Sequence, residues 1–297
     1  MFGFLNIYKP RGLSSYDVIR RIKPLLPPDE KVGHAGTLDP EAQGVLMICL
    51  GPATRLSDWV RRYEKEYVTL ATLGATSTTD DTDGQITART NVVPPESERV
   101  AAAMSAFIGQ TQQRPPAHSA VHVDGKRAYR MARAGQEVQI EPRPVTIYRI
   151  EILAYEYPRL RLKIRCASGT YIRALVRDVG EVLGTGAYCQ EIIRTAIGPF
   201  RAEDALQLEE LDRAGIVANL LPPAAAIPEE FRVALPADGV WAITRGQLVA
   251  WPALTDLQRQ QSELAAVDAQ GRLIALVKPL EDTLKPLKVF MREPPAP

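Results

Sequence analysis

The sequence contains no apolar run that approaches the roughly 20 residues needed to cross a bilayer. Its first residues also lack the charged and apolar regions of a signal peptide, so we expect a cytoplasmic protein without a membrane partner. Cysteine is scarce: the chain has three, an odd number, and no two of them form a C-x-x-C pair. This pattern predicts buried thiols rather than a metal or redox site.

The chain also has little net charge, +1 over 297 residues, but that charge is unevenly distributed. Residues 203–270 hold eleven acidic and four basic residues, so the positive charge lies mainly in the first 200 residues. Two basic stretches occur there, one with Lys126, Arg127, Arg130 and Arg133, the other with Arg159, Arg161, Lys163 and Arg165. They suit either a face that neutralises nucleic-acid phosphates or an ordinary solvated surface, and charge alone does not choose between these.

A hydrophobic content of 45% is enough for one large domain and one small one. The periodicity of apolar residues predicts mixed α and β structure, without the regular alternation of a doubly wound sheet. The predicted strands cover residues 4–8, 45–50, 65–73, 145–155 and 160–167, the last two as an antiparallel pair. The predicted helices cover residues 14–25, 53–62, 99–108 and 171–183, and Ser14 with Asp17 resembles a capping box at the start of the first. Residues 65–73 alternate in the manner of a strand and lead into a polar, acidic loop at residues 76–83. A hairpin or a strand-to-helix turn is expected after residue 119.

The character of the chain changes after about residue 200. The acidic segment 206–221 indicates a helix, and the prolines that follow it mark a boundary. Beyond this boundary, short strands are predicted at residues 232–235, 240–243, 264–268 and 273–278. We therefore expect two domains, residues 1–228 and residues 229–297, the second being a small β-rich module that either contacts RNA or caps the first.

The segment from residue 31 to residue 41 is the most informative for chemistry. Gly33 and Gly36 flank His34, and Asp39 precedes Pro40, so the segment is a loop. Proline restricts the residue before it to extended geometry, which presents the Asp39 carboxylate in a fixed direction, and glycine lets a ligand approach closely. Asp39 is therefore a candidate catalytic carboxylate. Spacing alone favours the plainer alternative, in which Asp39 caps a turn and His34 packs beside it.

Two other side chains could complete a site. Arg173 lies where a basic strand turns into a helix, and a guanidinium beside a carboxylate lowers the pKa of the acid by roughly 1 to 3 units. A structural salt bridge explains Arg173 equally well. Tyr67, between charged residues on an otherwise apolar strand, is by itself more often a core residue than a catalytic one.

Together these segments resemble the motifs of bacterial tRNA pseudouridine synthases of the TruB type. The order and spacing of four motifs agree with that family across residues 3–200. They are Lys9-Pro10 with Gly12 and Ser14, the catalytic segment Gly33–Pro40, the tyrosine segment Lys65–Tyr67, and the arginine segment Gly169–Arg173.

The resemblance implies an α+β fold, with a mixed, largely antiparallel sheet of the pseudouridine synthase type, flanking helices and a small C-terminal PUA-like RNA-binding domain. It also implies a monomeric enzyme that isomerises uridine 55 in the T loop of tRNA by base flipping, with the T stem-loop as its partner. The reaction requires neither a cofactor nor a metal, because one carboxylate can detach and rejoin the base.

The resemblance further assigns roles to residues. Asp39 is the nucleophile, attacking either ribose C1′ or uracil C6, while Tyr67 stacks on the target base and Arg173 pairs with Asp39. His34 occupies the space left in the RNA by the flipped bases. The other expected RNA contacts are Lys9, His118, His122, Lys126, Arg127, Tyr129 and Arg130. His118 and His122 stand where the family usually has tyrosine and lysine, which puts phosphate binding there in question because neutral imidazole carries less charge.

Two other classes of function remain open at this point. One is a non-catalytic RNA-binding or tRNA-folding protein on the same scaffold, which the presence of the Asp39 carboxylate disfavours. The other is a hydrolase with an aspartate nucleophile. Retaining glycosidases need a second carboxylate as acid and base, and the sequence offers no obvious partner for Asp39.

Overall fold

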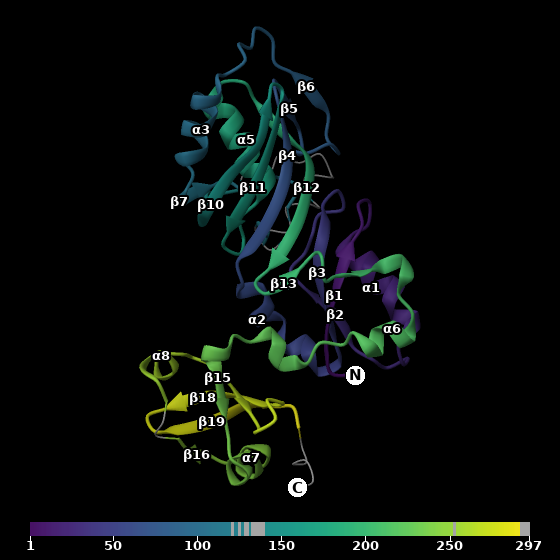
Figure 1. The fold of residues 1–297 in the computed structure, drawn as a ribbon, viewed down its shortest axis with the longest axis vertical. Coiled ribbons are helices and arrows are strands. Elements are labelled where there is room, and N and C mark those ends of the chain that lie inside the picture. The colour runs from purple at the N-terminus through teal and green to yellow at the C-terminus, as the bar shows by residue number, and fades with distance from the viewer. Residues whose placement is uncertain (120–121, 124–125, 128–130, 132–139, 252–253, 292–297) are drawn as a thin grey trace.

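The computed structural model describes residues 1–119, 122–123, 126–127, 131, 140–251 and 254–291. Within these residues a ten-stranded sheet and a five-stranded sheet carry most of the β structure, and helices flank both (Figure 1). The fold is α+β with a mixed, mainly antiparallel sheet, as predicted. Every helix in the described ranges is too short or too polar to span a bilayer.

The large sheet runs in the order β14-β1-β3-β12-β4-β11-β10-β7, with β13 paired to β12 and β2 paired to β3. Within this sheet, only the β1–β14 and β3–β12 pairs are parallel among its described strands. Its strands are β1 (Gly3–Lys9), β2 (Val32–Ala35), β3 (Gln43–Leu50), β4 (Lys65–Leu73), β7 (Gly109–Gln113), β10 (Arg143–Glu156), β11 (Arg159–Cys166), β12 (Ala187–Ile197), β13 (Phe200–Arg201) and β14 (Leu206–Gln207).

Helices α3 and α5 lie together on one face of this sheet, beside β10 and β11, and cover a core of side chains from β4, β11 and β12 (Figure 1). The helices of the described chain are α1 (Ser15–Ile22), α2 (Ser57–Arg62), α3 (Ser97–Ser105), α5 (Ile172–Leu183), α6 (Arg213–Ala218), α7 (Ala237–Thr244) and α8 (Asp256–Arg259). Shorter 3₁₀ turns cover Lys23–Leu25, Gly51–Leu56, Leu208–Glu210, Pro223–Ala226 and Glu229–Phe231.

Local sequence explains several of these elements. The Ser14 side chain accepts a hydrogen bond from the Asp17 amide and the Asp17 carboxylate accepts one from the Ser14 amide, which is the predicted capping box of α1. In β4, alternate residues are buried, so Tyr67 lies on the same face of the sheet as α5. Helix α5 ends at Gly184, whose φ of 71° suits glycine.

The five-stranded sheet has the order β15-β17-β18-β19-β16. It contains β15 (Arg232–Ala234), β16 (Val249–Ala250), β17 (Leu264–Val267), β18 (Leu273–Leu280) and β19 (Thr283–Val289). One hydrophobic cluster joins it to the large sheet, because Val267 and Leu276 pack with Phe4 and Leu56. The Trp59 indole also donates a hydrogen bond of 2.9 Å to Glu263. The small sheet is thus packed directly against the first strands of the chain.

Three predictions are wrong. Residues 32–35, expected to belong to a loop, form strand β2, which pairs with β3, because so short a strand with a glycine in it leaves no clear apolar period. Residues 240–243 form part of helix α7 rather than a strand, because a short apolar run does not distinguish the two. The segment 206–221 is not one helix: it contains β14, a 3₁₀ turn and the six-residue α6. Of the two alternatives expected after residue 119, a hairpin or a strand-to-helix turn, the antiparallel pair of β8 (His122–Val123) and β9 (Lys126–Arg127) supports the hairpin. A further hairpin of β5 (Ala75–Ser77) and β6 (Ile86–Ala88) escaped prediction.

The three cysteines are buried and free, as predicted. Burial raises the pKa of Cys49 to about 12 and that of Cys166 to about 11, so neither is an activated thiol.

Candidate active site

Asp39 lies in the loop between β2 and β3, and both of its neighbours are fixed by the N-terminal segment. The Leu38 amide donates to Ser15 Oγ at 2.9 Å. The Pro40 carbonyl accepts from the Gly12 amide at 2.8 Å and from Lys9 Nζ at 3.1 Å. The loop therefore has a defined backbone, and the Asp39 side chain, 38% exposed, remains available to a ligand.

Arg173, in the first turn of α5, is the partner of Asp39. Its Nε and Nη2 atoms lie 3.0 Å and 2.8 Å from Asp39 Oδ2. The guanidinium is only 4% exposed and also pairs with Asp81 at 3.1 Å. Burial alone lowers the pKa of Arg173, but Asp39 and Asp81 outweigh burial and the net pKa is raised. Arg173 is therefore a permanent cation beside a partly exposed carboxylate.

Asp81 was missed by sequence reasoning, which treated residues 76–83 only as a polar, acidic loop. Its carboxylate is 8% exposed, and Arg173 also donates to the Thr79 carbonyl at 2.7 Å and the His118 carbonyl at 3.0 Å. These contacts hold the guanidinium in one orientation. The sequence did contain one signal, the cluster of Asp80, Asp81 and Asp83. Because a carboxylate is buried at low cost only beside a cation, such a cluster indicates a buried basic residue nearby if one of its members lies inside the protein.

Tyr67 lies on β4 and lines the same pocket as Asp39 and Arg173. Its side chain is buried, which raises the pKa of the phenol, while the nearby cation Arg194 opposes that rise. The phenol is accordingly neutral and presents an apolar ring with one polar tip. The structure thus brings together the three residues expected at the site.

The pocket around Asp39 has a volume of about 340 Å³ and receives side chains from five segments of the large domain. Its lining includes Leu38, Asp39, Arg61, Lys65, Tyr67, Thr170, Tyr171, Arg173, Ile192 and Arg194. A larger hollow of about 770 Å³ lies away from Asp39, between β13 and residues 218–232. The smaller pocket is the candidate site because it holds the carboxylate and the guanidinium together.

The pocket is strongly positive. Asp39 is the one acidic residue that lines it in the described part of the chain, against Arg61, Lys65, Arg173 and Arg194. Burial lowers the pKa of Lys65 to about 8, and Arg194 adds to this effect. Sequence reasoning did not single out Arg61 or Arg194, because nothing in their local context distinguishes them from other basic residues, and it named Lys65 only as part of the tyrosine segment. A positive pocket of this size suits one nucleotide with its phosphate.

His34 lies on β2 and is half-buried. Burial, followed by the charges of Arg61 and Arg194, lowers the pKa of its imidazole, so the ring is neutral at physiological pH. Its Nδ1 atom is buried and has no hydrogen-bond partner among the described residues. A neutral ring suits packing against RNA better than proton transfer.

Lys9 does not fit the role expected for it. The residue is fully buried, and its ammonium donates to the carbonyls of Pro10 at 2.9 Å, Leu13 at 2.7 Å and Pro40 at 3.1 Å. Burial lowers the pKa of Lys9 to about 8. All three donors are used inside the protein, so Lys9 supports the Asp39 loop and cannot reach an RNA phosphate. Lys9 was expected to contact RNA because of its place in the N-terminal motif, and the spacing of that motif does not reveal that the side chain is buried.

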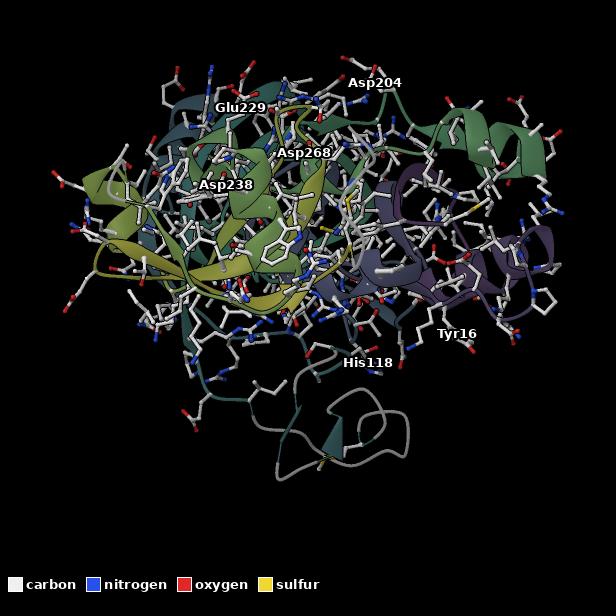
Figure 2. The ribbon with its side chains drawn as sticks, turned by 90° about the horizontal axis from the view of Figure 1, so that it is seen from below. Tyr16, His118, Asp204, Glu229, Asp238 and Asp268 are labelled. Atoms are coloured by element: carbon white, nitrogen blue, oxygen red, sulfur yellow. The ribbon has the colours of Figure 1, made fainter. Side chains whose placement is uncertain are left out.

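The remaining expected RNA contacts come from the segment after β7. His118 is half-buried and lies at the side of the molecule from which the β8–β9 hairpin projects, opposite the acidic residues Asp204 and Glu229 (Figure 2). His122 belongs to β8, and Lys126 and Arg127 belong to β9. Tyr129 and Arg130 lie outside the described residues.

Within the described ranges, no group of three or more His, Cys, Asp or Glu residues could hold a metal ion.

Comparison with known proteins gives consistent results. Residues 23–172 match the sequence model of the N-terminal domain of TruB family pseudouridylate synthases, and residues 173–221 match the model of the tRNA pseudouridylate synthase B C-terminal domain. A tRNA pseudouridine synthase B of Dehalococcoides mccartyi is 37% identical over 98% of this chain and 97% of its own length. One from Pseudomonas syringae is 45% identical over 71% of this chain and 68% of its own length.

Solved structures agree with this result. A chain of an H/ACA RNP bound to a substrate RNA containing 2′-deoxyuridine is similar, with a TM-score of 0.76, 27% identity, and coverage of 98% of this chain and 86% of that chain. A chain of a Cbf5-Nop10-Gar1 complex has the same TM-score of 0.76 at 29% identity, with coverage of 98% and 86%.

Proposed function

Because this chain belongs to the TruB family of pseudouridylate synthases, we propose that it acts on the uridine at position 55 in the T loop of tRNA, with Asp39 as nucleophile. As a member of that family it is an isomerase that converts uridine to pseudouridine in tRNA. Beyond this activity, we propose that the target lies in the T loop and that individual residues have the roles given below. The observation that carries it is the Asp39–Arg173 pair, 2.8 Å apart, in a nucleotide-sized pocket.

In the proposed reaction the Asp39 carboxylate attacks ribose C1′ or uracil C6. The bond from C1′ to N1 breaks, the uracil rotates, and a bond from C1′ to C5 forms. The bond to Asp39 breaks in the same sequence, by displacement from C1′ or by elimination from C6, so the free carboxylate is regenerated. The proton on C5 is lost and N1 gains one, so the product is an isomer of the substrate. This balance requires neither an oxidant nor a metal.

Tyr67 and Arg173 support this reaction in different ways. The Tyr67 ring stacks on the uracil and its hydroxyl can take part in proton transfer. Arg173 holds the Asp39 carboxylate in position and balances its charge until attack. Flipping the nucleotide costs a few kcal/mol, which stacking worth about 1 to 3 kcal/mol per base offsets. His34 fills the space that the flipped bases leave.

The alternatives are weaker. A protein that only binds and folds RNA has no need of a carboxylate fixed against a guanidinium inside a pocket. A retaining glycosidase needs a second carboxylate facing the substrate, yet Asp39 is the one acidic residue in the described lining of the pocket, and Asp81 is 8% exposed and paired with Arg173. Both arguments favour isomerisation at Asp39.

We also propose that residues 1–228 form the catalytic domain, and that residues 229–297 form a PUA-like RNA-binding domain in a cytoplasmic monomer. The packing of the small sheet against Phe4 and Leu56 supports a fixed position for it relative to the pocket.

The direct test uses an unmodified tRNA transcript. Incubation with the wild-type protein, followed by chemical mapping of pseudouridine, is expected to give one modified position, uridine 55. Modification at another tRNA position would refute the T-loop assignment while leaving the isomerase assignment intact. A transcript without any pseudouridine would refute both.

Arg61 is expected to contact a phosphate of the flipped nucleotide. It lines the pocket from helix α2, its side chain is 52% exposed, and Asp58, at 3.0 Å, orients the guanidinium. Each phosphate contact contributes about 0.9 to the slope of log affinity against log salt concentration. We therefore predict that Arg61→Ala weakens tRNA binding several-fold and reduces the steepness of that slope by about 0.9.

Arg62 provides the matched control, because it is exposed on the same helix but stacks over Trp59, 5.2 Å from the ring centroid. Arg62→Ala should leave the salt slope unchanged. Filter binding of labelled tRNA at a series of salt concentrations measures both variants. Equal slopes for wild type and Arg61→Ala would show that Arg61 makes no phosphate contact.

A further inference from the structure

Arg194 is a buried cation of β12 to which no role has been assigned. It is 2% exposed, and on the β4 side its neighbour across the ladder is Tyr67. On the other side its backbone pairs with Gly44 of β3. A Cβ atom on Gly44 would lie 2.2 Å from the Arg194 carbonyl oxygen, so the two strands approach too closely for any larger residue. The Arg194 backbone is therefore fixed in place.

The Arg194 guanidinium reaches back to the Asp39 loop. Nη2 donates to the Gly36 carbonyl at 3.1 Å, Nη1 to the Thr37 carbonyl at 3.2 Å, and Nε to the Val45 carbonyl at 2.9 Å. These acceptors lie before and after the loop that carries Asp39. One side chain thus ties both ends of that loop to β12.

The other supports of the loop come from a different direction. Ser15 holds Leu38 and Lys9 holds Pro40, and both residues belong to the N-terminal segment. Arg194 instead holds the loop from β12. This strand lines the pocket with Ile192 and Arg194 and pairs with Tyr67 of β4. Without Arg194, the Gly36 and Thr37 backbone would lose its side-chain tie to β12, and the contact of Arg173 with the Asp39 side chain would have to hold the loop toward the pocket.

We propose that Arg194 is a positioning residue, which fixes the catalytic loop relative to Tyr67 so that the Asp39 carboxylate meets the flipped nucleotide in a reactive geometry. The proposal rests on the proposed function, because it needs Asp39 to be the nucleophile. Arg194 acts through the Gly36 and Thr37 backbone and does not itself touch the reacting atoms.

The shape of the Arg194 donor group allows one side chain to hold the loop at both ends. A planar guanidinium presents donors in a rigid fork that reaches three separate carbonyls, whereas a lysine ammonium is a compact charge on a shorter arm. Arg194→Lys keeps the positive charge but cannot satisfy all three acceptors. A displacement of a reacting group by about 1 Å is enough to lower a rate about 100-fold.

The test is single-turnover kinetics on an unmodified tRNA transcript, with enzyme in saturating excess. Under these conditions an inactive or unfolded fraction of enzyme does not lower the rate constant of the bound complex, so a role in folding alone leaves it unchanged. Arg194→Lys is expected to lower the rate constant about 10- to 100-fold while the dissociation constant for tRNA stays within about threefold. Arg194→Ala should be slower still.

Arg149→Lys is the matched control, because Arg149 is exposed on β10, lies outside both basic stretches and the pocket lining, and should keep the wild-type rate. If wild type itself forms no pseudouridine, the proposed function fails first. If wild type is active and Arg194→Lys keeps its rate within about threefold, the positioning role is wrong. It is equally wrong if the rate falls only in proportion to tRNA affinity. Should Arg194→Ala fail to fold, the lysine variant decides alone.

Discussion

Asp39→Asn is expected to abolish pseudouridine formation, with a loss of single-turnover rate on the order of 10⁴-fold or more. An amide has nearly the shape of a carboxylate but lacks its nucleophilic charge, so the base cannot be detached. The Asp39 loop should keep its backbone, because Ser15 and Lys9 hold Leu38 and Pro40 rather than the Asp39 side chain. Binding of tRNA is therefore expected to persist within about threefold.

Pseudouridine mapping and filter binding on the same transcript measure these two quantities separately. Asp29→Asn is the control, since Asp29 is exposed and lies away from the pocket lining. A fully active Asp39→Asn enzyme would remove Asp39 from the nucleophile role. A variant that lost activity and tRNA affinity together would point to a damaged binding surface.

Replacing Arg173 is expected to have the second largest effect, and it acts on both rate and stability. Arg173→Met leaves Asp81, 8% exposed, as a buried charge without its partner, which costs about 3 to 5 kcal/mol of unfolding free energy. It also leaves the Asp39 carboxylate unpositioned. Arg173→Lys keeps the charge but cannot make the two contacts to Asp39 Oδ2, so we expect a rate loss of about 100-fold in a folded protein.

A double variant separates the two effects. Asp81→Asn combined with Arg173→Met removes the unpaired charge, so urea unfolding should show a partial recovery of stability. The rate should not recover, because Asp39 still lacks its partner. Arg177→Lys, one turn further along α5, is the control with a near-normal rate. A wild-type rate for Arg173→Lys would contradict the positioning of Asp39 by the guanidinium.

Most of the regular structure could be predicted because it depends on local patterns. The capping box of Ser14 and Asp17, the alternation in β4 and the antiparallel pair of β10 and β11 are all confirmed. The failures occur where local signals are short or mixed. Helix α7 was taken for a strand because residues 240–243 are apolar. No strand was predicted at β12, whose alternation is interrupted by two register shifts against β4.

What the sequence by itself determined is the chemistry available at the loop. Asp39 before Pro40, Tyr67 on an alternating strand and Arg173 at a helix start are read from neighbouring residues, and their spacing supports the resemblance to TruB-type synthases. Only the tertiary structure decided which of these groups meet. Arg173 reaches Asp39 across 134 positions of sequence, Arg194 reaches Thr37 across 157, and Lys9 turns inward to Pro40. Such pairs form because a buried charge must find a partner, and the fold, not the local sequence, brings that partner within reach.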